Sequence, residues 1–125
     1  MYKIAKFEKV SIENFITSFK KLNGDVPLSI IEKIYNEIKL PKRATTGSAG
    51  YDFFLPDAIC LKNGQTIVIP TGIRVKIEPG WVLQIFPRSG LGFKYRLQLD
   101  NSVGIIDSDY YNSDNEGHIF VKLSC

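Results

Sequence analysis

The N-terminal third of the chain carries the hydrophobic spacing of helices. Between Ser11 and Gly24, four apolar residues recur at helical intervals: Ile12, Phe15, Ile16 and Phe19. This spacing places them on one face of a helix, and Ser11 and Gly24 are residue types that begin and end helices. A second stripe starts near Pro27 and stops before Pro41: Ile30, Ile31, Ile34, Tyr35 and Ile38. Because residues 3–10 have a short-strand pattern, we expect a strand and two helices over residues 1–41.

From residue 42 onward, the pattern changes to short β-type runs separated by turns. Ile73, Val75 and Ile77 alternate with basic residues, and apolar residues alternate again over 119–123. Asn63-Gly64 predicts a hairpin between residues 58–61 and 66–69, and a turn at 78–80 leads into a predicted strand over 81–86. Many short strands joined by Gly and Pro turns indicate a β-sandwich, barrel or jelly roll.

Length and composition favour one globular domain. The 125 residues suffice for one hydrophobic core, since domains usually hold about 100–150 residues. We expect a single domain over 1–125, with residues 1–41 as an α-containing prefix and 42–125 as the β domain. No stretch approaches the ~20 consecutive apolar residues that span a bilayer. Residues 1–7 lack the apolar run of a secretory signal, so we expect a cytoplasmic protein without a membrane partner.

Charge and cysteine content exclude several kinds of partner. The net charge is +3, and the Lys and Arg residues are scattered rather than grouped into a stripe that would follow a run of phosphates. Nucleic acid is therefore not an expected partner, whereas a small polyanion suits this weak positive charge. Cys60 and Cys125 form neither a disulfide framework nor the spacing of a metal site.

Three segments have compositions that strand propensity does not explain. Residues 44–52 are small residues leading to Asp52, residues 87–92 contain Arg88-Ser89-Gly90, and residues 101–110 hold two carboxylates and a phenol after a turn. Taken alone, each segment can be interpreted without a function: the first as a turn, the second as a Gly-rich loop and the third as a solvated acidic loop. Together they suit polyphosphate chemistry, because Arg and hydroxyl groups bind phosphate oxygens and carboxylates bind Mg²⁺ or activate water.

The same three segments resemble a known enzyme family. PKRATTGSAGYD, FPRSGLG and NSVGIIDSDY are similar, in order and separation, to the first three of the five motifs of trimeric deoxyuridine triphosphatases. The resemblance covers about residues 39–123. It implies a mainly β fold, a jelly roll or distorted β-barrel with the N-terminal strand and two-helix prefix, assembled as a homotrimer. It also implies Mg²⁺-dependent hydrolysis of dUTP to dUMP and pyrophosphate.

The resemblance further implies a role for individual residues. Asp52 would hold the metal through its water shell, and Asp107 would deprotonate the water that attacks the α-phosphorus. Tyr110 would stack under the deoxyribose and exclude a 2′-hydroxyl. The remaining residues would bind the substrate, three at the phosphates and three at the uracil hairpin: Arg88, Ser89 and Gly90, then Asn101, Gly104 and Ile106.

The sequence departs from the family pattern in two places, and the second departure leaves an alternative function open. Residues 111–116 are inserted after the third motif, where we expect a surface loop. The chain stops at Cys125, before the fourth and fifth motifs, so we expect these 125 residues alone to be a weak catalyst.

A non-catalytic nucleotide-binding or regulatory module is the alternative to a dUTP-hydrolysing enzyme. A dCTP deaminase relative is disfavoured, because Glu78 and Glu116 lie in predicted turns rather than in a strand carrying a general base.

Two further expectations concern ring side chains outside the motifs. The single histidine, His118, is expected at the surface rather than in catalysis. Five aromatic side chains fit a β core better than a base-stacking platform: Phe53, Phe54, Trp81, Phe86 and Phe120.

Overall fold

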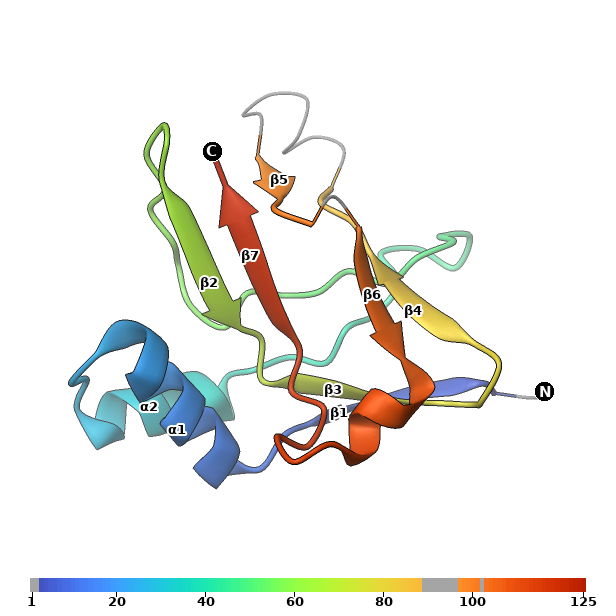
Figure 1. Ribbon diagram of the computed structural model, residues 1–125, viewed down its shortest axis with the longest axis horizontal. Coiled ribbons are helices and arrows are strands. Elements are labelled where there is room, and N and C mark those ends of the chain that lie inside the picture. Colours follow the sequence, from blue (N-terminus) through green and yellow to red (C-terminus); the bar gives the residue numbers. More distant parts are fainter. Residues whose placement is uncertain (1–2, 89–96, 102) are drawn as a thin grey trace.

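A computed structural model describes residues 3–88, 97–101 and 103–125. Its elements follow the chain in this order: β1 (Ala5–Lys9), α1 (Ile12–Asn23), α2 (Leu28–Asn36), β2 (Thr66–Pro70), β3 (Ile73–Ile77), β4 (Val82–Ile85), β5 (Gln98–Leu99), β6 (Gly104–Asp107), the short 3₁₀ helix η1 (Ser108–Asn112) and β7 (Phe120–Ser124). The predicted mainly β fold with an N-terminal strand and two helices is confirmed (Figure 1). Within the described ranges, no helix is long and apolar enough to cross a membrane.

The strands pair across long sequence separations. β1 lies antiparallel to β3, β7 lies between β2 and β5, and β4 pairs with β6. In Figure 1 the two helices lie together at one end of the molecule, whereas β4 and β6 stand on the opposite side. On β3, the apolar residues Ile73, Val75 and Ile77 are buried and alternate with more exposed basic residues, which is the predicted half-buried strand pattern.

Local signals account for the first helix. The Ser11 side chain accepts a hydrogen bond from Asn14 N, and Gly24 ends the helix with a φ of 77°. A positive φ is the conformation in which glycine avoids the clash that a side chain would introduce. The second helix ends at Asn36, before the predicted stop at Pro41, although Ile38 is still buried.

The prefix packs on the β region through a shared apolar core. This core contains residues from both helices, the segments beside them and the start of β3: Val10, Phe15, Phe19, Ile31, Ile38 and Ile73. A second cluster joins Ile69, Leu99 and Leu123 across the β2–β7–β5 sheet. Burial of these side chains is the main stabilising contribution, at about 25 cal/mol per Å² of apolar surface.

The structure corrects several expectations. Residues 58–61 form no strand, and β2 pairs with β7 instead of with a hairpin partner. Three of the aromatic side chains expected in the core are exposed, with exposed fractions of 54% for Trp81, 61% for Phe86 and 38% for Phe120. Phe53 and Phe54 are partly buried. A strand requires a pairing partner and a core position requires a facing sheet, and neither is visible in the local sequence.

Candidate functional site

A pocket lies where the turn between β5 and β6 meets β7. Its volume is about 260 Å³, and its lining includes Asn101, Gly104 and Ile106, the three residues predicted to form the uracil hairpin. A methyl group added at Gly104 would lie 3.2 Å from Ile85 Cβ on the paired strand. Glycine therefore allows β6 to approach β4 closely at the pocket wall.

The strand that leads into this turn is anchored to β7 by polar contacts. Asp100 N donates to Lys122 O at 3.0 Å, and the Lys122 ammonium lies 3.4 Å from the Asp100 carboxylate. The Ser124 hydroxyl also donates a hydrogen bond to that carboxylate. Because Asp100 directly precedes Asn101, these contacts hold one side of the pocket mouth against a central strand.

The β4–β6 ribbon has two faces of different character. The register places Val82 opposite Asp107 and Gln84 opposite Ile105, and all four residues are exposed. Residues directly opposite in an antiparallel pair share a face. The other face carries Ile85 and Gly104, which line the pocket together with Ile105 of the exposed face. The carboxylate of Asp107 thus belongs to an exposed face that also presents the apolar side chains of Val82 and Ile105.

Tyr110 lies in η1, directly after β6, and its phenol is held by two groups. Tyr110 Oη donates to His118 O at 2.6 Å and accepts from Asn115 Nδ2 at 3.0 Å. The side chain is partly buried. These bonds fix the phenol end of the side chain.

The residues predicted for the phosphate side are less completely placed. Arg88 is exposed after the end of β4, whereas Ser89 and Gly90 lie outside the described residues. Asp52 is partly buried and exchanges backbone hydrogen bonds with Lys42 at 2.8 and 3.3 Å. No hydrogen bond or ion pair within the described ranges joins Asp52 or Arg88 to Asp107.

The described residues also contain no cluster of three His, Cys, Asp or Glu side chains arranged to hold a metal ion.

His118, expected at the surface, is completely buried. Gly72 N donates to its Nε2 at 2.9 Å, and its ring centroid lies 4.5 Å from that of Phe120. Burial lowers the pKa of His118 to about 4, and the negative charge of Glu116, which acts to raise this pKa, has a smaller effect. The imidazole is therefore neutral near pH 7 and has a structural role. The next residue, Ile119, is apolar and also completely buried, and it is the local signal that could have indicated this burial.

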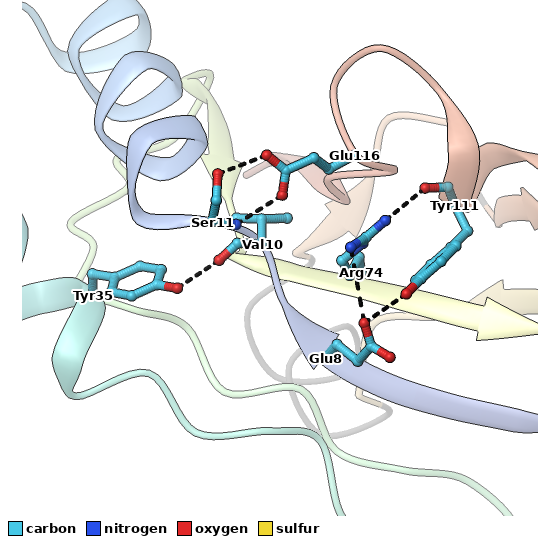
Figure 2. A network of polar contacts seen from close by, with 7 residues as sticks. All are labelled: Glu8, Val10, Ser11, Tyr35, Arg74, Tyr111 and Glu116. Atoms are coloured by element: carbon cyan, nitrogen blue, oxygen red, sulfur yellow. Dashed lines mark hydrogen bonds and ion pairs between the residues drawn. The ribbon is translucent and has the colours of Figure 1, made fainter.

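The inserted residues 111–116 are bonded to the prefix rather than free at the surface (Figure 2). Ser11 Oγ donates to Glu116 Oε2 at 2.6 Å, and this hydrogen bond lowers the pKa of Glu116. Tyr111 Oη donates to Glu8 Oε1 at 2.8 Å, and Arg74 Nη2 donates to Tyr111 O at 2.8 Å. Sequence reasoning missed this network, because its members come from four separate segments.

Comparisons with known proteins identify the family. Residues 36–122 match the family model described as dUTPase. The deoxyuridine 5′-triphosphate nucleotidohydrolase of Lactococcus lactis is 45% identical over 87 residues, covering 69% of this chain and 58% of that protein. The protein of the same name from Pseudomonas syringae is 52% identical over 81 residues, covering 62% and 54%. The chain thus spans little more than half the length of these curated relatives.

Solved structures give the same result for the fold. The dUTPase of Streptococcus mutans superposes with a TM-score of 0.66 at 35% identity, covering 94% of this chain and 76% of that one. The dUTPase of the Staphylococcus aureus phage phi11 superposes with a TM-score of 0.63 at 23% identity, covering 98% and 60%. The second likeness concerns the fold alone. The motifs, the matched family model and the Streptococcus mutans structure together show that the chain belongs to the dUTPase family.

Proposed function

We propose that this chain binds dUTP and hydrolyses it to dUMP and pyrophosphate. The observation that carries the proposal is the pocket of about 260 Å³ whose lining includes Asn101, Gly104 and Ile106, with Asp107 and Tyr110 following directly in the chain. A narrow pocket beside a strand offers backbone donors and acceptors at fixed positions, which suits the small uracil ring. The close approach of β6 to Ile85 favours this base over larger ones.

Asp107 is proposed as the general base. A carboxylate accepts a proton from water, and the resulting oxygen nucleophile attacks the α-phosphorus while pyrophosphate leaves on the opposite side. The exposed position of Asp107 at the end of β6 leaves it open to a water molecule and a substrate. Tyr110, three residues further on in η1, is proposed to stack under the deoxyribose and to exclude a 2′-hydroxyl.

The phosphates are proposed to bind at Arg88, Ser89 and Gly90. The guanidinium of Arg88 can donate two parallel hydrogen bonds to phosphate oxygens, and its exposure leaves it accessible to them. Asp52 is proposed to hold a Mg²⁺ ion through water, and its carboxylate has no side-chain hydrogen bond or ion pair within the described residues. When bound, the ion would neutralise charge on the triphosphate.

We propose that the chain forms one domain and assembles as a homotrimer in which neighbouring subunits complete each site. The exposed face of the β4–β6 ribbon supports this arrangement, because Val82 and Ile105 are 48% and 50% exposed and share that face with Asp107. Apolar side chains grouped at a surface mark interaction sites. Assembly through or beside this face would place Asp107 near residues of a second subunit.

The test of the function is Asp107→Asn, with Asp109→Asn as the matched control. Asp109 is also an exposed carboxylate, on η1. The amide keeps the shape of Asp107 but cannot accept the proton, so turnover of dUTP should fall about 10²–10⁴-fold with little change in dUTP binding. The control should turn over dUTP like the parent. Equal turnover in Asp107→Asn and the parent would refute the assignment of the base.

The same assay decides between an enzyme and a nucleotide-binding module. Pyrophosphate release from dUTP with Mg²⁺ is measured beside dUTP binding by calorimetry. If the parent chain binds dUTP without releasing pyrophosphate, it acts as a binding module, and the catalytic part of the proposal is wrong.

A further inference from the structure

The phenol of Tyr110 is held by the two ends of one loop. Its Oη donates to His118 O at 2.6 Å and accepts from Asn115 Nδ2 at 3.0 Å. Both partners lie in the segment that joins η1 to β7 and includes most of the insertion. The orientation of Tyr110 therefore depends on where this segment is held.

One side chain from α1 contacts both of these partners. Asn14 Nδ2 donates to Asn115 O at 2.8 Å, and Asn14 Oδ1 lies 2.7 Å from His118 Nδ1. The protonation of His118 determines which atom of the Asn14 amide faces its ring. Because Gly72 N donates to His118 Nε2 at 2.9 Å, the neutral imidazole carries its proton on Nδ1 and donates it to Asn14 Oδ1. Both functional atoms of the Asn14 amide are thus used on the loop.

A second contact holds the same loop to the start of α1. Ser11 N and Ser11 Oγ donate to the two carboxylate oxygens of Glu116 at 2.8 and 2.6 Å, as Figure 2 shows. Glu116 has a φ of 62°, in the left-handed region that is unfavourable for a residue with a side chain. The hydrogen bonds to Ser11 hold the loop in this conformation. Asn14 lies one turn further on, in a helix whose first turn is fixed by the same cap.

We propose that Asn14 is a positioning residue for Tyr110, through which helix α1 of the prefix controls discrimination between deoxyribose and ribose. The inference rests on the proposed function, in which Tyr110 stacks under the sugar. Removing the Asn14 amide breaks its hydrogen bonds to Asn115 O and His118 Nδ1 and leaves the longer contact of 3.4 Å between Ser18 Oγ and His118 Nδ1. The Tyr110 ring thereby gains freedom to move away from the space that a 2′-hydroxyl would occupy. The helices thereby contribute to substrate selection without contacting the substrate.

The experiment compares Asn14→Ala with Asn23→Ala, a matched change in the same helix. Asn23 Nδ2 donates only to Phe19 O of α1 within the described structure. Steady-state kcat/KM is measured for dUTP and UTP, or the two dissociation constants if turnover is too slow. We expect Asn14→Ala to lower the preference for dUTP over UTP about fivefold, equivalent to about 1 kcal/mol. Asn23→Ala should keep the preference of the parent.

A double-mutant cycle separates positioning from general loss of stability. If Asn14 acts through the Tyr110 hydroxyl, Asn14→Ala should change the preference little when Tyr110→Phe is already present. Equal effects in both backgrounds would overturn the inference. Asn14→Asp provides a second variant in case Asn14→Ala does not fold, because it keeps the acceptor for His118 and loses the donor to Asn115. If a folded Asn14→Asp variant keeps the parent's preference for dUTP over UTP, the inference is also overturned.

Tyr110→Ala distinguishes failure of this inference from failure of the proposed function. If Tyr110→Ala lowers the preference for dUTP and the Asn14 variants do not, only the positioning role is wrong. If Tyr110→Ala also leaves the preference unchanged, Tyr110 does not select the sugar, and the proposed role of Tyr110 is overturned together with that of Asn14.

Discussion

The guanidinium carbon of Arg74 lies 3.7 Å from the centroid of the Tyr111 ring. Arg74 also donates from Nη2 to Tyr111 O at 2.8 Å and lies 3.9 Å from the Glu8 carboxylate. The hydrogen bond that Tyr111 donates to Glu8 raises the pKa of its phenol. One arginine on β3 thus joins the first strand of the prefix to the helix η1 that follows Asp107.

Arg74→Lys is expected to destabilise the fold by about 1–2 kcal/mol, because lysine keeps the charge but loses the planar stacking and the directed hydrogen bond. Arg43→Lys is the control, since Arg43 is exposed and its guanidinium carbon lies 5.2 Å from the Tyr51 ring centroid. It should change stability by less than about 0.5 kcal/mol. Urea denaturation measures the stability of both variants. Equal midpoints for Arg74→Lys and Arg43→Lys would show that the contacts of Arg74 do not contribute to stability.

His118 should make stability depend on pH in a defined window. Burial lowers its pKa from the ordinary 6.5 to about 4, so between these values the unfolded chain binds more protons than the folded one. Stability should therefore fall as pH decreases from about 6.5 to 4, by about 3 kcal/mol for this group. The sequence has one histidine, so its NMR signals report the pKa directly. A midpoint near 6.5 would contradict the burial.

Gly117→Ala should be more damaging than Gly64→Ala. Both glycines have a positive φ, of 71° and 79°, but an added Cβ at Gly117 would lie 2.7 Å from Tyr110 O, whereas nothing lies within 4 Å of one at Gly64. The backbone conformation alone costs an alanine about 1–2 kcal/mol, and the clash should add about 1–3 kcal/mol. Denaturation midpoints of the two variants give the difference, and similar losses would mean that the loop moves aside freely.

Val82→Lys should weaken the assembly of subunits without unfolding them. The side chain lies on the exposed ribbon face beside Asp107, and burial of a lysine charge in an apolar interface is unfavourable. Leu28→Lys is the matched control, because Leu28 on α2 is 47% exposed, close to the 48% of Val82. Sedimentation velocity should show a lower mass for Val82→Lys and the parent mass for Leu28→Lys. Unchanged assembly in both variants would place the interface elsewhere.

The sequence alone determined the elements whose signals are local. The Ser11 cap and the Gly24 stop predicted α1 closely, and alternation predicted β3. The three motifs led to the family, which the comparisons confirmed. The roles of Asp52, Arg88 and Asp107 remain predictions, since they depend on ligands and neighbouring subunits.

Only the tertiary structure decided which residues meet. Residues 58–61 had the composition of a strand but form none, and β2 pairs with the distant β7 instead of with them. Strand register, which is set by distant partners, turned Gly104 toward the pocket and Asp107 to the exposed face. The burial of His118 and the contacts of Asn14 with residues 115 and 118 join segments about a hundred positions apart. Such contacts depend on how the helices and sheets pack, which hydrophobic periodicity along the chain does not encode.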